Sequence, residues 1–362
     1  MDVMREFSDA RVYYPNGPAK AAVKPGEYVF SVSRMEHGHI YGMTQALIDA
    51  GATLKYAWDA NPDNLAAFLR RYPQAKAAKC EQEILDDPET RMVACAAIPC
   101  ERSALGIRVM RAGKDYFTDK APFTTLEQIT DARAAVHETG RHYWVYFSER
   151  LHNEASTLAQ AMIEQGQIGR VIHVEGLGPH KLGGPRPDWF YRKAQYGGIL
   201  CDIGSHQTEQ FMIWAGTENV RVTHSRIANY AHPETLELDD FGDCLLEGDN
   251  GVTGYFRVDW FTPNPLRVFG DSRIFILGTN GYIELKKTID VTSEALYGNR
   301  LLLVNDHGEQ RFDAHGVTGY PFFGKMLLDS LNGTDNAMTQ EHIFRAAELC
   351  LIAQRDAIQV QQ

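Results

Sequence analysis

The sequence predicts an α/β protein in which a doubly wound parallel sheet precedes an α+β domain with a large, mostly antiparallel sheet. In the first 150 or so residues, short β-rich runs alternate with helical patterns, which is typical of parallel βαβ units. Beyond that point most runs are strands separated by turns, which favours antiparallel pairing. The length of 362 residues suits two domains. We therefore divide the chain into residues 1–26, 27–150 and 151–362.

Residues 1–26 contain several prolines and glycines and no regular pattern. They are predicted to form an irregular N-terminal arm. Such an arm is either a flexible terminus or a segment that packs on a partner subunit, and the sequence leaves both possibilities open.

Residues 27–150 alternate between strand and helix patterns. Ile40, Met43 and Leu47 share one face of the first predicted helix, and Gly51 ends it. Thr124 and Glu127 predict a capping box before the last helix of this half. The predicted strands are 28–33, 53–59, 91–99, 115–122 and 142–150, and the predicted helices are 39–51, 61–73, 101–114 and 125–140.

The second half begins with one more predicted helix and continues as strands. Asn280-Gly281 is the typical signal for a β-hairpin turn. Residues 251–261 carry bulky side chains at both alternating sets of positions, which predicts that the second face of the sheet is buried in a homodimer or homotetramer. The predicted helix is 155–169, and the predicted strands are 170–178, 219–231, 241–248, 251–261, 272–279 and 281–287.

The charge and cysteine content exclude several classes of protein. The net charge of −11 disfavours nucleic acids and anionic membranes as partners, although a local pocket can still be basic. The six cysteines form no CxxC pair and do not suggest a metal site, so we expect reduced thiols in a cytoplasmic protein. We find neither an apolar stretch long enough to span a bilayer nor a secretory signal.

The loop after the first predicted strand lies where a doubly wound domain binds a pyrophosphate. It contains Glu36, His37, Gly38, His39 and Ile40. A Gly-rich loop and a helix N-terminus offer backbone N–H groups and close approach to a dinucleotide. The spacing is imperfect, because Gly38 and Gly42 are four residues apart rather than three.

Asp59 ends the second predicted strand, 21 residues after Gly38. An acidic residue at about this distance accepts hydrogen bonds from the adenosine ribose. No arginine follows it closely to bind a 2′-phosphate, so NAD is favoured over NADP. Alternatively, Asp59 caps the helix that follows.

Three stretches resemble the Gfo/Idh/MocA family of NAD(P)-dependent sugar and polyol oxidoreductases. FTDKAPFTT looks like the family's Glu-Lys-Pro strand end, although Ala121 separates Lys120 from Pro122. GGILCDIGSHQTEQFMIWAG is similar to the family's signature helix with its Asp-x-x-x-His pair, and AMIEQGQIGRVIHVEG is similar to the passage between the two domains. The resemblance covers roughly residues 27–362. It implies a dinucleotide-binding Rossmann domain over 27–150 and a substrate-binding and oligomerisation domain over 151–362.

The resemblance also implies roles for individual residues. Lys120 would place a positive charge beside the substrate oxygen, and His206 would be the acid/base, with a pKa close to the working pH. Asp202, four residues before His206, would hold a substrate hydroxyl or orient the imidazole; alternatively it is a helix N-cap. Pro99 and Asp119 are expected on the cofactor side, and Glu149 and Arg150 form either a site segment or a structural ion pair. The expected substrate contacts outside the catalytic set are His180, Arg186, Trp189 and Tyr191, all in the loop 178–195.

The expected function is hydride transfer between nicotinamide and a secondary alcohol or ketone of a sugar, glycoside or cyclitol. The same chemistry run in reverse would make the protein a carbonyl reductase. Two further hypotheses stay open: the protein is a redox-neutral, NAD-dependent lyase or glycosidase, or it is a non-catalytic sensor of NAD and sugar.

Overall fold

The computed structural model describes residues 10–292 and 297–360. Its first half is a parallel sheet of six strands in the order β4-β3-β2-β5-β6-β7, with helices in the crossover connections. Because β2 lies at the centre, the order reverses beside it, which is where doubly wound sheets bind ligands. The elements are β2 (Val29–Ser33), α1 (His39–Asp49), β3 (Thr53–Trp58), α2 (Pro62–Arg71), β4 (Lys76–Ala77), α3 (Glu81–Asp86), β5 (Met92–Cys95), α4 (Pro99–Arg111), β6 (Asp115–Asp119), α5 (Leu126–Thr139) and β7 (Tyr143–Tyr146).

The second half is built on a ten-stranded sheet in the order β1-β15-β14-β13-β12-β8-β11-β10-β9-β16. Most neighbours are antiparallel, but β8 and β11 are parallel, as are the two edge pairs β1–β15 and β9–β16. The strands are β1 (Ala10–Arg11), β8 (Val171–Pro179), β9 (Val220–Ala228), β10 (Phe241–Gly248), β11 (Thr253–Asp259), β12 (Arg273–Gly278), β13 (Gly281–Lys286), β14 (Arg300–Asn305), β15 (Gly308–Asp313) and β16 (Ile358–Gln359).

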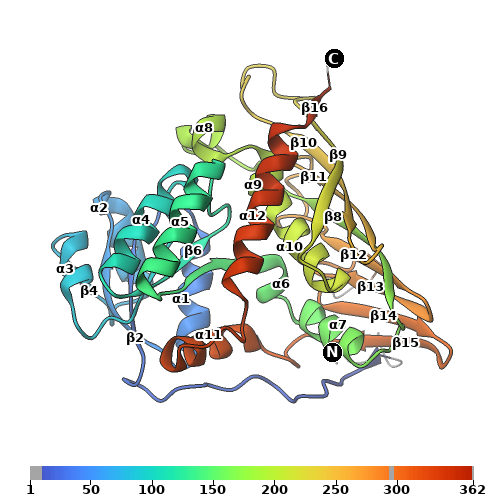
Figure 1. Cartoon of the computed structure of the whole chain (residues 1–362), viewed down its shortest axis with the longest axis horizontal. Coiled ribbons are helices and arrows are strands. Elements are labelled where there is room, and N and C mark those ends of the chain that lie inside the picture. Colours follow the sequence, from blue (N-terminus) through green and yellow to red (C-terminus); the bar gives the residue numbers. More distant parts are fainter. Residues whose placement is uncertain (1–9, 293–296, 361–362) are drawn as a thin grey trace.

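Helices cover one side of this large sheet, and in Figure 1 α10 (Gly204–Ala215) and α12 (Gln340–Arg355) lie between it and the parallel half. α10 packs on β8, where a Cβ at Gly176 would lie 2.3 Å from Oε1 of Gln207, so glycine is needed for the close approach. The helices are α6 (Ser148–Leu151), α7 (Glu154–Glu164), α8 (Lys193–Tyr196), α9 (Ile199–Asp202), α10 (Gly204–Ala215), α11 (Pro321–Asn332) and α12 (Gln340–Arg355), with a 3₁₀ turn at Asp188–Tyr191.

Two local predictions differ from the structure. The capping box of α5 is formed by Thr125 and Gln128 rather than by Thr124 and Glu127, because Thr125 is the extended residue before the first helical turn. The β12–β13 hairpin is present, but Gly281 pairs with Gly278, so the turn is made by Thr279 and Asn280. In both cases the predicted motif is present, but its position is shifted by one residue.

The described part of the N-terminal arm contacts both halves of its own chain. Ala10 and Arg11 add the edge strand β1 to β15, Ala19 donates to the carbonyl of Thr318, and Ala22 donates to that of Ala50. Residues 1–9 of the predicted arm lie outside the described residues. Among the helices that are described, none combines the length and apolar character needed to cross a bilayer.

Candidate active site

A pocket of about 600 Å³ lies where the carboxyl ends of β2 and β7 and the residue after β6 face the helical layer of the second half. Ligands of doubly wound sheets bind at this edge. Its lining is dominated by cationic, imidazole and aromatic side chains. The lining residues are Glu36, His37, Gly38, His39, Lys120, Tyr146, Ser148, Glu149, His152, Asn153, His180, Lys181, Arg186, Pro187, Trp189, Phe190, Asp202, His206, Trp260, Phe269, Lys287 and Thr288.

The loop before α1 forms one wall of the pocket. Gly38 is the N-cap residue of α1, no side chain caps this helix, and its first turn carries no acidic residue. The space beside Gly38 is open, because a Cβ there would meet nothing within 4 Å. This helix start therefore lies at the pocket with no side-chain cap among the described residues, as anion-binding helix termini do.

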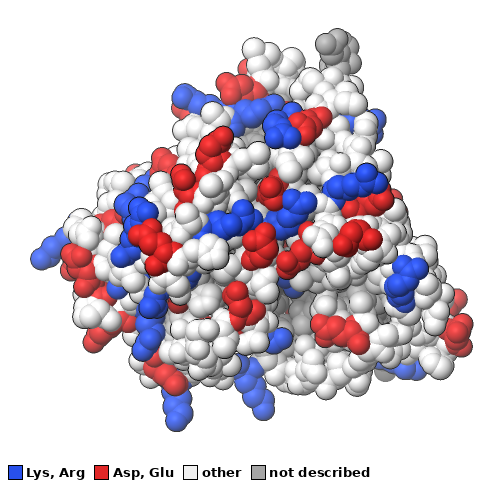
Figure 2. All heavy atoms as spheres, viewed as in Figure 1, with Lys and Arg blue, Asp and Glu red and all other residues white. Residues whose placement is uncertain are grey.

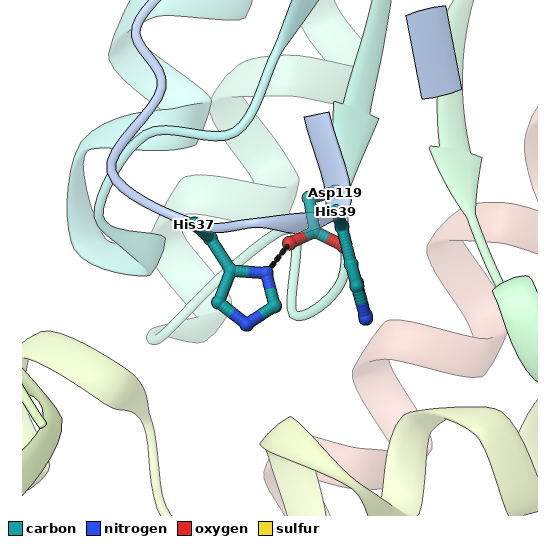
Figure 3. A group of neighbouring side chains, drawn as sticks. All are labelled: His37, His39 and Asp119. Carbon is teal, nitrogen blue, oxygen red and sulfur yellow. Dashed lines mark hydrogen bonds and ion pairs between the residues drawn. The ribbon is translucent and has the colours of Figure 1, made fainter. Parts of the chain in front are cut away.

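Asp119, at the end of β6, lies between two imidazoles of this loop (Figure 3). Its carboxylate oxygens are 2.7 Å from Nδ1 of His37 and 2.8 Å from Nδ1 of His39. A tetrahedral zinc site with bonds of about 2.0–2.1 Å separates its ligand atoms by roughly 3.3 Å. The contacts here are shorter. Nδ1 of His39 forms a hydrogen bond with Asp119 and Nδ1 of His37 lies at ion-pair distance, so we interpret the cluster as a carboxylate that orients two imidazoles.

The two imidazoles present their other ring nitrogens away from Asp119. Figure 3 shows the Nε2 edge of each ring pointing to the side opposite the carboxylate. Burial is the main cause that lowers the pKa of His37 to about 4, so this ring is neutral at physiological pH. A proton on Nδ1, facing Asp119, leaves Nε2 as a hydrogen-bond acceptor for a ligand.

Lys120 and Asp202 bring the two halves of the chain together in the pocket. Nζ of Lys120 lies 2.5 Å from Oδ1 of Asp202, and both side chains are largely buried. Burial alone would raise the pKa of Asp202, but the ammonium of Lys120 lowers it below its usual value. Asp202 thus contacts Lys120 and does not cap α10, whose N-cap is Ile203.

Arg102 fixes the backbone that carries Lys120. This side chain is fully buried and donates to the carbonyls of Ala97, Lys120 and Ala121, and also to the carboxylate of Asp119. The Lys120–Ala121 peptide bond is cis. Arg102 was not predicted as a site residue from the sequence. The signal that could have found it is its position in the first turn of a helix that follows a central strand.

His206 projects from α10 and is almost completely buried. Burial lowers its pKa to about 3; Glu149 opposes this shift, and Lys120 adds to it. The expected pKa near the working pH is therefore wrong for this structure, because the sequence does not show how deeply the ring is buried. His206 is a neutral imidazole, and its Nδ1 has no hydrogen-bond partner among the described residues.

Glu149 anchors a buried polar cluster behind His206. Its Oε2 accepts hydrogen bonds from Gln207 (2.9 Å), Ser272 (3.0 Å) and Lys287 (3.1 Å). Nε2 of His180 lies 3.9 Å from Oε1, the oxygen that accepts no hydrogen bond in the described chain. Glu149 is therefore held rigidly while one oxygen faces the imidazoles.

Arg150, the next residue, points elsewhere and pairs with Glu209. The structure thus separates the two members of the expected Glu149–Arg150 ion pair. Lys287, the actual partner of Glu149, is 138 residues away in the sequence, and no local signal pointed to it.

Not every expected site residue reaches the pocket. Tyr191 does not line it, and Ile40, Pro99 and Asp119 lie behind its wall. Asp59 is also buried, and its two oxygens accept hydrogen bonds from the backbone N–H groups of Met35 (2.6 Å) and Asn61 (2.7 Å). It does not cap α2, because the side chain of Asn61 does so. The pocket residues that sequence reasoning missed include Tyr146, Ser148, His152, Asn153, Phe269, Lys287 and Thr288.

Comparison with known proteins identifies the family. Residues 157–284 match the GFO/IDH/MocA C-terminal domain. This chain belongs to the Gfo/Idh/MocA family. The matched segment contains Asp202, His206 and the loop 178–195, so it supplies most of the pocket lining from the second half, whereas Lys287 and Thr288 lie beyond it.

Solved structures agree with this assignment over almost the whole chain. A protein of known crystal structure from Erwinia carotovora atroseptica is 48% identical, with a TM-score of 0.89, covering 92% of this chain and 100% of that one. A levoglucosan dehydrogenase solved in complex with NADH has a TM-score of 0.73 at 17% identity and covers 91% of this chain and 98% of that one. At that identity, the second likeness concerns the Gfo/Idh/MocA fold alone.

A curated relative extends the comparison. The scyllo-inositol 2-dehydrogenase (NAD(+)) of Bacillus subtilis is 26% identical over 257 residues, which cover 70% of this chain and 72% of that protein. The Gfo/Idh/MocA member described here thus shares part of its sequence with a dehydrogenase of a cyclitol.

Proposed function

We propose that this protein is an NAD-dependent oxidoreductase that transfers a hydride between nicotinamide and a secondary alcohol or ketone of a sugar, glycoside or cyclitol. The observation that carries the proposal is the meeting of Lys120, Asp202 and His206 in one pocket beside the uncapped start of α1. Relatives that act on scyllo-inositol with NAD(+), or that bind NADH and carry the name levoglucosan dehydrogenase, support the same reaction class.

The residues around α1 fit a dinucleotide. The open space at Gly38 and the uncapped helix start suit a pyrophosphate, and the residues that would hold the cofactor are Glu36, His37, Gly38, His39 and Lys120. Bound NAD would accept or supply the hydride, which no side chain can do. Asp59, which accepts a hydrogen bond from the backbone of Met35 beside this loop, lies on the expected ribose side, and this favours NAD over NADP.

Lys120 and His206 divide the work on the substrate hydroxyl. When a C–H bond is oxidised as hydride, the oxygen becomes more negative, and the ammonium of Lys120 stabilises that charge in a buried pocket. The neutral imidazole of His206 takes the hydroxyl proton. Asp202 holds Lys120 in place and offers its remaining lone pairs to a neighbouring hydroxyl.

The experiment that tests this proposal follows NADH formation at neutral to alkaline pH with purified protein, NAD and a panel of sugars, glycosides and inositols. We expect turnover with at least one of them. His206→Asn should reduce it by roughly 10²–10⁴-fold, the usual contribution of a general base. Arg192→Gln, a change at an exposed residue outside the pocket, is the control and should keep full activity.

Two other outcomes would point elsewhere. Product formation from a glycoside without net NADH would indicate a redox-neutral lyase or glycosidase. Binding of NAD and sugar without any turnover, in either direction, would indicate a sensor.

We also propose that the protein is a cytoplasmic homodimer or homotetramer that uses the face of the large sheet not covered by helices. That face carries Leu245, Tyr255, Phe275 and Tyr282, and the rings of Phe275 and Tyr282 stack at 5.0 Å. The six cysteines are free, as expected for the cytoplasm. Analytical ultracentrifugation tests the assembly: Leu245→Glu with Tyr255→Glu should give monomers, and a monomeric wild type would contradict the proposal.

A further inference from the structure

We propose that the substrate carries an anionic group, a carboxylate or a phosphate, and that Lys181 and Arg186 bind it. The inference rests on the proposed function, because it concerns the substrate of the same pocket. It names a subclass of substrate: acidic or phosphorylated sugars and polyols rather than neutral ones.

The first observation is the pairing of charges around the pocket. Each carboxylate that lines it already faces a cation. Asp202 pairs with Lys120 at 2.5 Å, and Glu149 pairs with Lys287 at 3.1 Å. Glu36 pairs with Arg34 at 2.6 Å. The two charges within each pair offset each other, so these carboxylates leave no negative charge to balance further cations.

Two cations remain on the pocket wall. Nζ of Lys181 donates to the carbonyls of Asn264 and Leu266, and no carboxylate lies within ion-pair distance in the described chain. The guanidinium of Arg186 donates to the carbonyls of Leu182 (2.7 Å) and Lys181 (3.0 Å). Carbonyl oxygens orient a cation without neutralising it, so both side chains keep a full positive charge.

Arg186 is held in a fixed position against aromatic rings. Its guanidinium carbon lies 4.9 Å from the ring centroid of Phe190 and 5.5 Å from that of Trp260. Such stacking orients a guanidinium while leaving N–H groups in its plane free. Two carbonyl bonds use two of its five N–H groups, so a forked donor set remains for a planar carboxylate or a phosphate.

The neighbouring histidines add no charge of either sign. Burial is the main cause that lowers the pKa values of His180 and His152 to about 4, so both rings are neutral at pH 7. The surplus of positive charge therefore belongs to Lys181 and Arg186. In a partly enclosed pocket, an anionic ligand would offset such a surplus favourably.

This surplus is local. The whole chain has a net charge of −11. On the face shown in Figure 2, basic and acidic side chains are interspersed without a broad basic area. In the same loop, Lys193 pairs with Asp239 at 2.8 Å. Arg192 also has no ion pair among the described residues, but it is exposed and lies outside the pocket, so Lys181 and Arg186 are the unpaired cations of this loop that line the pocket.

The test measures binding separately from turnover. Tryptophan fluorescence of the NAD-saturated protein would be titrated with D-glucose, D-glucuronate, D-gluconate and D-glucose 6-phosphate, since Trp189 and Trp260 line the pocket. Three variants follow: Lys181→Met, Arg186→Gln and, as the matched control, Arg192→Gln in the exposed part of the loop. Circular dichroism confirms that each variant is folded.

We expect at least one anionic probe to bind about tenfold or more tightly than D-glucose, with an advantage that falls as salt rises. Arg186→Gln and Lys181→Met should remove this preference, whereas Arg192→Gln should keep it. Comparison of the affinities for D-glucuronate and D-gluconate with that for D-glucose 6-phosphate shows whether a carboxylate or a phosphate is preferred. Equal or weaker binding of all anionic probes, or no binding at all, would overturn the inference. Anion-selective binding without NADH formation would instead leave the inference standing and reject the proposed dehydrogenase function.

Discussion

Nζ of Lys120 lies 2.5 Å from the carboxylate of Asp202. This contact joins the end of a strand in the parallel sheet to a helix of the second half. The two residues are 82 positions apart in the sequence. The contact holds the side chain of Lys120 inside the pocket beside an opposite charge. It also makes the two halves of the site depend on each other, which leads to a first prediction.

Lys120→Met should abolish turnover and destabilise the fold. Removal of one partner of a buried ion pair leaves the other uncompensated, at a cost of about 3–5 kcal/mol. The double variant Lys120→Met with Asp202→Asn should recover most of that stability in urea unfolding while staying inactive. As control, Lys55→Met breaks a partly exposed pair with Asp87 and should cost below about 1 kcal/mol. If the double variant is as unstable as the single one, the pair does not stabilise the fold.

Glu149→Gln should slow turnover through His206. Glu149 is a positioning residue here: its negative charge raises the pKa of His206 against the effect of burial. Without that charge the imidazole is a weaker base, so kcat should fall about tenfold and the pH profile should shift. Glu209→Gln, which removes a buried carboxylate outside the pocket lining, is the control. If Glu149→Gln lowers the yield of folded, active protein but leaves the pH profile of turnover unchanged, Glu149 has a structural role only.

Asp119→Asn should weaken NAD binding by roughly tenfold, a factor that corresponds to about 1.4 kcal/mol. The amide replaces an oxygen that faces the Nδ1 atoms of His37 and His39 by an N–H donor, so the two imidazoles lose their fixed orientation. Isothermal titration with NAD measures the change. Asp115→Asn, a buried residue at the other end of the same strand, should lower stability without changing NAD affinity. If Asp119→Asn leaves the affinity for NAD unchanged, the cluster of His37, His39 and Asp119 does not contribute to cofactor binding.

Stability should decrease as the pH falls from about 6.5 towards 4. His37, His152, His180 and His206 have folded-state pKa values of about 4, 4, 4 and 3, below the ordinary value of 6.5. The unfolded chain therefore takes up protons below pH 6.5 that the folded protein cannot, and the stability present above pH 6.5 is lost.

Each of these histidines lowers the free energy of unfolding by up to about 1.4 kcal/mol per pH unit in that range. Urea unfolding between pH 7.5 and 4.5 measures the slope. His180→Gln should make it shallower, whereas His307→Gln, in an exposed turn, should leave it unchanged. A flat stability curve over this range would contradict the burial of the four rings.

The sequence by itself determined the architecture and indicated the candidate reacting groups. Alternation of strand and helix patterns is a local property, so it indicated the parallel half, the antiparallel half and the division near residue 150. Lys120 at a strand end, and Asp202 with His206 four residues later, were recognisable because short spacings and motifs fix which side chains share an edge or a face. Cap and turn signals were correct to within one residue, as at Thr125 and Asn280.

Only the tertiary structure decided what surrounds those groups. The contacts of Lys120 with Asp202 and of Glu149 with Lys287 join residues 82 and 138 positions apart, and the packing of the two halves sets them. Burial depth also follows from that packing, so the sequence suggested a titrating His206 while the fold makes it a neutral imidazole. The same holds for Lys181 and Arg186: the sequence shows two basic residues in a loop, and only their three-dimensional neighbours show that no carboxylate within residues 10–292 and 297–360 balances them.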